Sequence, residues 1–184
     1  MMKNVIFLGS KPLGYFCLQK LLEYQINHKL KVIGVFSNDN QIFGGKSFRE
    51  LSKREKIPFF DNINDIFKIK KDIHFLVSVQ YHKILKKKHL DIVINRAINL
   101  HMAPVPEYRG CNQFSFAIYN RENEFGTTLH IMDEGIDSGN IIAERRFPIP
   151  KDIRVKELLN KTKEESKILF LENLSKIFDL ELKP

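Results

Sequence analysis

Short apolar runs alternate with amphipathic stretches along the first eighty residues. Residues 5–8 form a buried-strand pattern that ends at Gly9, and a helical spacing of apolar positions follows from Pro12 to Leu22. The same order recurs, with strands expected at 31–36, 59–60 and 73–79 and helices at 47–56 and 62–70. Alternating strands and helices predict an α/β, Rossmann-like fold with a mostly parallel twisted sheet flanked by helices.

The second half of the chain is more irregular. A strand ending over 97–101 leads into a loop over 102–110 that holds Pro104, Pro106 and Gly110. A helix at 112–119, strands at 126–132 and 140–148 separated by a Gly-rich acidic turn, and a helix at 155–178 follow. Because there is neither an internal repeat nor a linker, we expect residues 1–184 to form a single domain.

Composition excludes several classes of protein. Hydrophobic residues make up 43% and charged residues 28% of the 184 residues, as in ordinary globular domains. No window is apolar enough for a membrane span, and the apolar run at 5–8 is too short for a signal peptide, so a cytoplasmic protein is expected. Cys17 and Cys111 lack partners at ligand spacing, which predicts neither a disulfide framework nor a metal site.

The chain is basic, with 30 Lys plus Arg against 22 Asp plus Glu and a net charge of +8. This balance suits an anionic partner. The lysine runs at 70–71, 86–88 and 161–167 fit solvated helix faces, and no aromatic residues are interleaved with them as a base-stacking surface would require.

Two glycine-containing loops resemble phosphate-binding motifs only in part. In the first, over 9–14, Lys11 stands where a dinucleotide fingerprint requires its second glycine. In the second, Gly45-Lys46-Ser47 resembles the end of a P-loop, but Asn40 replaces the first glycine. The second loop therefore predicts a helix start capped by Ser47.

Candidate chemistry lies between residues 99 and 139. Asn99 and His101 are two apart at the end of an expected strand, so both side chains point to one face, where open α/β sheets gather their functional groups. The turn over 133–139 adds carboxylates after another strand. If the two clusters meet, an amide, an imidazole and the carboxylate of Asp137 converge without a Ser or Cys nucleophile, which suits acyl transfer to an external nucleophile. Taken alone, the spacing favours a structural interpretation, with His101 a satisfied, partly buried residue and the acidic turn a cap.

Four stretches together resemble the signature of the folate-dependent formyltransferases. They are Ile98-Asn99-Leu100-His101, Pro104-Val105-Pro106-Glu107-Tyr108-Arg109-Gly110, Phe125-Gly126-Thr127-Thr128-Leu129-His130 and Met132-Asp133-Glu134-Gly135-Ile136-Asp137-Ser138-Gly139. This superfamily contains glycinamide ribonucleotide formyltransferase, methionyl-tRNA formyltransferase and the nucleotide-sugar N-formyltransferases. One departure is that His101-Met102-Ala103-Pro104-Val105-Pro106 stands where the family usually has His-Pro-Ser-Leu-Leu-Pro, so a different proline shapes the loop.

The resemblance implies 10-formyltetrahydrofolate as formyl donor and an amine as acceptor. It implies that the catalytic residues are Asn99, His101 and Asp137, the last because the family's catalytic aspartate stands directly before the pair that is Ser138-Gly139 here. The residues that it implies for folate binding are His82, Lys83, Ile84, Leu85, Asp133, Glu134 and Gly135. Those that it implies for acceptor binding are Ser10, Lys11, Gln80, Tyr81, Met102, Tyr108 and Arg109.

The start of the chain and the stretch 109–118 look most similar to enzymes that formylate amino sugars on a nucleotide diphosphate, of the dTDP- or UDP-4-amino-4,6-dideoxy sugar type, for surface polysaccharides such as O-antigen. Lys11-Pro12 argues against glycinamide ribonucleotide, and the lack of residues for a second domain argues against tRNA. The expected partners are folate and a nucleotide sugar, with neither membrane nor nucleic acid; a homodimer is left open. Two alternatives also remain, a non-catalytic nucleotide- or RNA-binding module and hydrolysis of the formyl donor.

Overall fold

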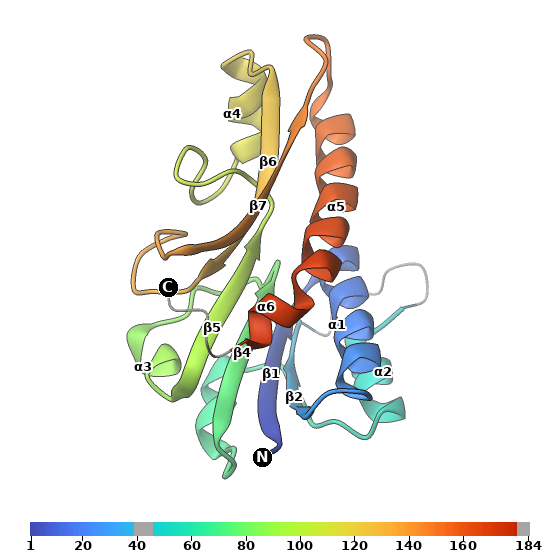
Figure 1. Cartoon of the computed structure of the whole chain (residues 1–184), viewed down its shortest axis with the longest axis vertical. Helices are drawn as coiled ribbons and strands as arrows, with labels where there is room; N and C mark the ends of the chain where they lie inside the picture. The colour runs from blue at the N-terminus through green and yellow to red at the C-terminus, as the bar shows by residue number, and fades with distance from the viewer. Residues whose placement is uncertain (39–45, 180–184) are drawn as a thin grey trace. The chain divides into compact units, whose positions relative to one another are not determined.

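A computed structural model describes residues 1–38 and 46–179 of the chain (Figure 1). Its strands form a seven-stranded sheet in the order β3-β2-β1-β4-β5-β6-β7, and helices flank it. Strands β1 to β4 pair in parallel, whereas β7 runs antiparallel to β6. The predicted α/β class with a mostly parallel sheet is confirmed.

Two compact units make up the chain, residues 1–98 and 99–184. The first unit holds β1 (Lys3–Gly9), α1 (Lys11–Gln25), β2 (Leu30–Phe36), α2 (Phe48–Arg54), β3 (Phe59–Phe60), the 3₁₀ helix η1 (Ile63–Lys68), β4 (Ile73–Val79), α3 (Lys87–Leu90) and most of β5 (Val93–His101). Every residue of β4 is buried, as are residues 5–8 of β1. Strands covered on both faces have continuous apolar runs, which is why these two were visible in the sequence.

The helices of the first unit agree with the sequence prediction at α2 and differ from it at η1 and α3. Ser47 caps α2 by accepting a hydrogen bond from the backbone N–H of Glu50 at 3.3 Å. Gly45, in the P-loop-like motif, lies outside the described residues. The helix expected at 62–70 is a shorter 3₁₀ helix, and α3 is a single turn that the pattern did not predict.

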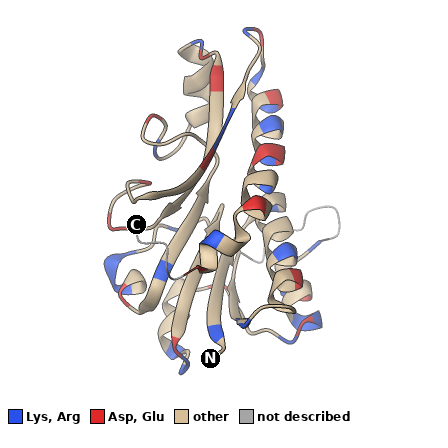
Figure 2. Cartoon of the chain, viewed as in Figure 1, with Lys and Arg blue, Asp and Glu red and all other residues tan. Residues whose placement is uncertain are grey.

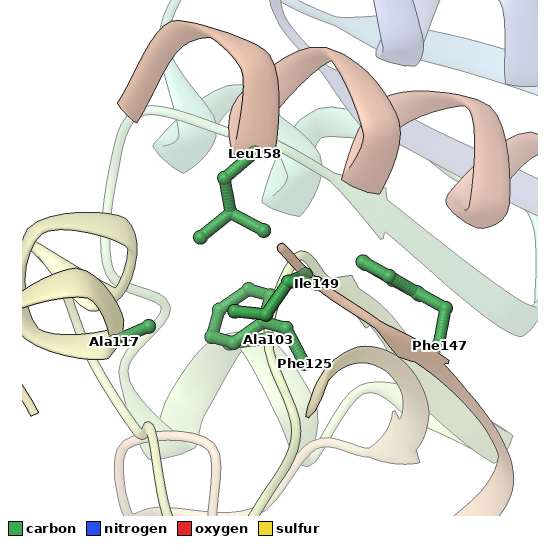
Figure 3. Packing of buried hydrophobic residues seen from close by; sticks show 6 residues of the cluster. All are labelled: Ala103, Ala117, Phe125, Phe147, Ile149 and Leu158. Atoms are coloured by element: carbon green, nitrogen blue, oxygen red, sulfur yellow. The ribbon is translucent and has the colours of Figure 1, made fainter. Parts of the chain in front are cut away.

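The second unit holds α4 (Gln113–Tyr119), β6 (Glu124–Ile131), β7 (Ile141–Pro148), α5 (Val155–Glu172) and α6 (Leu174–Phe178). Phe125 of β6 is fully buried at the centre of its core, and Ala117 from α4, Leu158 from α5 and Phe147 from β7 pack around it (Figure 3). This core joins both helices to the β6–β7 hairpin, and the hairpin carries the acidic turn.

One predicted element is wrong in extent. The amphipathic pattern over 155–178 predicted one helix, but it is broken at Asn173 into α5 and α6. The buried side-chain amide of Asn173 donates to the carbonyl oxygen of Leu169 at 2.8 Å, and its backbone leaves the helical region. Asparagine competes with the helix backbone in this way, and apolar periodicity does not detect it.

None of the helices in the described part of the chain has an apolar stretch long enough to cross a bilayer.

Candidate active site

The carboxyl end of β5 carries the first two predicted catalytic residues. Asn99 and His101 alternate with Leu100, which is almost fully buried. Since side chains of a strand alternate between faces, the amide and the imidazole share one face. His101 is also largely buried, with 7% of its surface exposed.

The acidic turn between β6 and β7 is held by its own side chains. Asp133 accepts hydrogen bonds from the backbone N–H of Gly135 at 3.0 Å and from the Ser138 hydroxyl at 2.7 Å. A Cβ on Gly139 would lie 2.0 Å from the carbonyl oxygen of Ile131, so only glycine fits there. The turn thus fixes the backbone on both sides of Asp137.

Asp137 is the centre of the site. Its Oδ2 accepts from the backbone N–H of Gly110 at 2.9 Å and lies 3.4 Å from Nδ1 of His101. Its Oδ1 accepts from Nδ2 of Asn99 at 3.3 Å and lies 3.2 Å from Nε2 of His130. The structure therefore brings together the three residues that the sequence assigned to catalysis.

The carboxylate of Asp137 is ionised near neutral pH. Burial by itself raises its pKa, but the hydrogen bond from His130, the charge of His101 and the Gly110 N–H outweigh burial and lower the pKa to about 2. Asp137 also has a positive φ of 47°, which is uncommon for a residue other than glycine. Such a conformation is held only by surrounding contacts, here the donors around the carboxylate.

His101 is fixed between two acceptors. Its Nε2 lies 2.7 Å from the backbone carbonyl oxygen of Tyr108, so this nitrogen carries a proton, and its Nδ1 faces Asp137. Burial lowers the pKa of His101, against the opposing effects of the Asp137 charge and the Tyr108 carbonyl. Burial therefore opposes the imidazolium form, and a second proton on Nδ1 would face the carboxylate of Asp137.

His130 is a member of the site that the sequence analysis did not single out. It is buried on β6, with Nδ1 2.8 Å from the carbonyl oxygen of Ile131 and Nε2 3.3 Å from Nδ2 of Asn99. The backbone N–H of Gly110 was missed as well. The sequence could have identified His130, because this residue is the last one of the Phe125–His130 stretch of the family signature.

The acceptor residues predicted on the 102–110 loop take different positions. Met102 is buried, Arg109 is exposed, and Tyr108 serves the site through its backbone carbonyl. The phenol of Tyr108 donates to Glu122 at 2.6 Å and packs on Phe125, so the side chain belongs to the core of this unit. Direct acceptor contacts by Met102 and Arg109 stay predictions.

The residues predicted at the ends of β1 and β4 form a second group, in the N-terminal unit. Ser10 is buried, with its Oγ 3.5 Å from Nδ1 of His82, and Lys11 has a φ of 60°. Gln80 also has a positive φ, of 53°. Burial and the charge of Asp61 raise the pKa of Tyr81 to about 12, and its buried hydroxyl has no hydrogen-bond partner among the described residues. Tyr81 therefore stays protonated and retains a donor.

The remaining predicted folate residues differ in exposure. Leu85 is buried, whereas Ile84 is 79% exposed and Lys83 is exposed beside it. Glu134 is exposed on the acidic turn, where Asp133 and Gly135 have the structural role given above. Within the ranges 1–38 and 46–179, no group of three or more His, Cys, Asp or Glu is placed to hold a metal ion.

Comparison with known proteins gives one consistent family. The family model described as formyl transferase matches residues 3–174. Among curated proteins, the methionyl-tRNA formyltransferase of Kosmotoga olearia is 30% identical over 98% of this chain and 60% of its own length, and that of Clostridium acetobutylicum is 30% identical over 85% and 53%. The chain thus spans somewhat more than half of these relatives.

Solved structures show the same fold. An N-formyltransferase from Helicobacter canadensis, in complex with folinic acid and dTDP-3-aminofucose, has a TM-score of 0.76 at 26% identity and covers 96% of this chain and 64% of its own. The phosphoribosylglycinamide formyltransferase of Bacillus halodurans has a TM-score of 0.76 at 23% identity, over 98% of this chain and 100% of its own.

Proposed function

Since the chain belongs to the formyl transferase family, we propose that it transfers a formyl group from 10-formyltetrahydrofolate to an amine on a nucleotide-linked amino sugar. One observation carries the chemistry. A partly buried, ionised aspartate is surrounded by an amide and two imidazoles, and one of the imidazoles is arranged to receive a proton. These are the groups required for direct acyl transfer to an external amine.

In the proposed reaction, the neutral amine attacks the formyl carbon and the bond from that carbon to the folate nitrogen breaks. His101 accepts the amine proton on Nδ1, where Asp137 and the Tyr108 carbonyl stabilise the resulting imidazolium. The proton then passes to the leaving folate nitrogen. We assign the side-chain amide of Asn99 to the developing oxyanion, toward which it would turn an N–H group that in this structure lies beside Asp137 and His130.

A protonated His101 could instead donate a hydrogen bond to the developing oxyanion. Burial opposes that state, and the Nε2 proton is already donated to the Tyr108 carbonyl. We therefore assign His101 to proton transfer and Asn99 to the oxyanion. The pH dependence of turnover distinguishes these roles.

Residues 82–85 of the N-terminal unit are proposed for folate binding, and so, separately, are Asp133, Glu134 and Gly135 of the second unit. Ile84 supports this position, because an isoleucine that is 79% exposed offers an apolar surface for the aromatic rings of a folate. Tyr81 supports the proposal that a polar ligand binds beside these residues, since its buried hydroxyl has no hydrogen-bond partner among the described residues.

The nucleotide-sugar acceptor is supported by the Helicobacter canadensis enzyme, whose structure contains dTDP-3-aminofucose. We assign Lys11, at the start of α1, and separately the exposed Arg109 of the second unit to acceptor binding, since each is a cation that can contact a phosphate group. The product would serve the synthesis of a surface polysaccharide.

Methionyl-tRNA is the second candidate acceptor. The curated relatives at 30% identity are methionyl-tRNA formyltransferases, and the net charge of +8 also suits a nucleic acid.

The deciding experiment measures release of tetrahydrofolate from 10-formyltetrahydrofolate, with thymidine- and uridine-diphosphate amino sugars, methionyl-tRNA, glycinamide ribonucleotide and water as separate acceptors. Release with an amino sugar supports the proposal, and release only with charged tRNA replaces its acceptor. Equal release with water and with every amine would make the protein a hydrolase of the formyl donor. A folded Asn99→Ala variant is the control, because losing an oxyanion donor should lower turnover about 10²- to 10³-fold.

A further inference from the structure

The buried face of α5 contains hydroxyl groups as well as apolar side chains. Thr162 and Ser166 lie on this face one helical turn apart, and neither has any exposed surface. Charged side chains occupy other positions along the helix (Figure 2). A buried hydroxyl costs free energy unless it is hydrogen-bonded, so each of these two needs a partner within its unit.

The two hydroxyls have different partners. That of Thr162 donates to the carbonyl oxygen of Leu158, in the same helix, at 2.8 Å. The hydroxyl oxygen of Ser166 lies 2.7 Å from the carbonyl oxygen of Thr162 and 2.8 Å from Oγ1 of Thr127 on β6. Of these two hydroxyls, that of Ser166 therefore reaches the sheet.

Thr127 continues this connection from α5 to β5. Its side chain is fully buried, and its Oγ1 donates to the backbone carbonyl oxygen of His101 at 2.8 Å. Because side chains of a strand alternate between faces, Thr127 and His130 lie on opposite faces of β6. His130 contacts the site from one face, and Thr127 holds the backbone of His101 from the other.

The number of protons determines how the pair of hydroxyls is arranged. Each hydroxyl has one proton, but the pair makes three contacts of hydrogen-bond length: to the carbonyl of His101, to the carbonyl of Thr162 and between the two hydroxyl oxygens. If Ser166 donated to Thr162, the contact between the hydroxyl oxygens would either lack a proton or take the one that Thr127 gives to His101. A chain from Ser166 to Thr127 to the His101 carbonyl avoids both conflicts, and hydrogen bonds in such a chain strengthen one another.

The backbone position of His101 matters because its ring has an acceptor on each side. Nε2 lies 2.7 Å from the carbonyl oxygen of Tyr108, and Nδ1 lies 3.4 Å from the carboxylate of Asp137. These acceptors belong to the 102–110 loop and to the acidic turn, so a displacement of the His101 backbone changes both distances. A displacement of about 1 Å in a catalytic group can lower turnover by about 10².

We propose that Thr127 is a positioning residue for His101: its hydroxyl, supported by Ser166, fixes the backbone of the histidine and thereby the distance from Nδ1 to Asp137. The effect on turnover rests on the proposed function, whereas the effect on the ring does not. Valine has nearly the shape of threonine and lacks only the hydroxyl, so a packing role alone would be served by either residue.

The first test replaces Thr127 with valine, which leaves the His101 carbonyl without this donor. The kcat for release of tetrahydrofolate should fall about tenfold, and the KM for 10-formyltetrahydrofolate should change less than about twofold. Ser166→Ala should lower kcat in the same direction by a smaller factor, because it removes only the support of Thr127.

A second readout does not depend on activity. Besides burial, the groups that act on the pKa of His101 are the Asp137 charge, the Tyr108 carbonyl and His130. The pKa, followed through the imidazole signal that a His101→Gln variant lacks in NMR, should fall in Thr127→Val, because the contact with Asp137 that raises it is loosened.

Two variants separate positioning from packing. Thr127→Ser keeps the hydroxyl but packs less well than valine, so it should restore kcat and the pKa of His101 only if the hydroxyl is what matters. The matched control is Thr162→Val, which removes an equally buried hydroxyl whose bond lies inside α5, and it should change neither quantity. Thermal melts show which variants are folded, and if Thr127→Val does not fold, the comparison of Ser166→Ala with Thr162→Val decides.

An unchanged pKa of His101 in folded Thr127→Val, or in Ser166→Ala where that variant decides, would overturn the inference. Equal effects in Thr162→Val, or no restoration in Thr127→Ser, would overturn it as well. If the wild-type protein releases no tetrahydrofolate with any acceptor, the proposed function fails, and the NMR comparison still decides the position of His101.

Discussion

Replacing Asp137 with asparagine separates the two roles open to His101. The substitution keeps the size of the side chain and removes the negative charge that faces Nδ1 of His101 at 3.4 Å. Without that charge the imidazolium loses its partner, so the pKa of His101, already lowered by burial, should fall further. Turnover should also fall, because the proton that leaves the amine is received less favourably.

The magnitude follows from the distance. Two unit charges 3.4 Å apart interact with about 5 kcal/mol at an effective dielectric constant of about 20, which is a ceiling. The carboxylate charge is shared with the Gly110 N–H, Asn99 and His130. A further decrease in the pKa of His101 is therefore expected, with a loss of about 10² to 10³ in turnover.

Two measurements check this expectation. Imidazole signals in NMR, assigned with a His101→Gln variant, give the pKa directly in the wild type and in Asp137→Asn. The pH dependence of kcat at saturating acceptor should show an acid limb that moves to lower pH in the variant, even though its plateau is lower. The pKa of the substrate amine is the same for both proteins, so it does not produce this shift.

A rise in the pKa of His101 in the Asp137→Asn variant would refute the assignment of the ring as proton acceptor. The same assignment would fail if kcat decreased above the pKa of His101 instead of below it. Wild-type turnover in a folded Asp137→Asn variant would refute the role of the carboxylate altogether.

Three further predictions concern the surroundings of the site. Phe125→Ala should lower the free energy of unfolding by about 3–5 kcal/mol in urea titrations, since the ring is fully buried; a change below about 1 kcal/mol would contradict its central place in the core. Gly139→Ala should abolish turnover or folding, because its Cβ would meet the carbonyl oxygen of Ile131; a fully active variant would show that the turn is not held as described. His130→Gln should lower kcat about tenfold with the fold intact by circular dichroism, because it orients Asn99 and Asp137 indirectly; an unchanged kcat would make His130 structural only.

The fold was largely predictable because its signals are local. Strands β1 and β4 are continuous apolar runs, and Ser47 caps a helix from the position where the sequence placed it. The two helices that were predicted wrongly or missed depend on features that apolar periodicity does not detect. Asn173 breaks the last helix through one side-chain hydrogen bond, and α3 is too short to show a period.

The sequence selected three residues that lie together in the structure, Asn99, His101 and Asp137, but it missed His130 and gave no information on where the protons lie. Spacing alone placed Asn99 and His101 on one face, and the resemblance selected Asp137 over Asp133; the structure explains that choice, since Asp133 is engaged in holding the turn. The nitrogen of His101 that carries no proton is determined by the carbonyl of Tyr108, seven residues away along the chain, and by burial. Neither effect can be inferred from the identity of a residue. The side chain of Tyr108 looks from sequence like a ligand-binding group, yet its carbonyl sets the tautomer of the histidine. The chemistry of this site therefore depends on a backbone atom, and variants of Asp137 test it more sharply than variants of Tyr108.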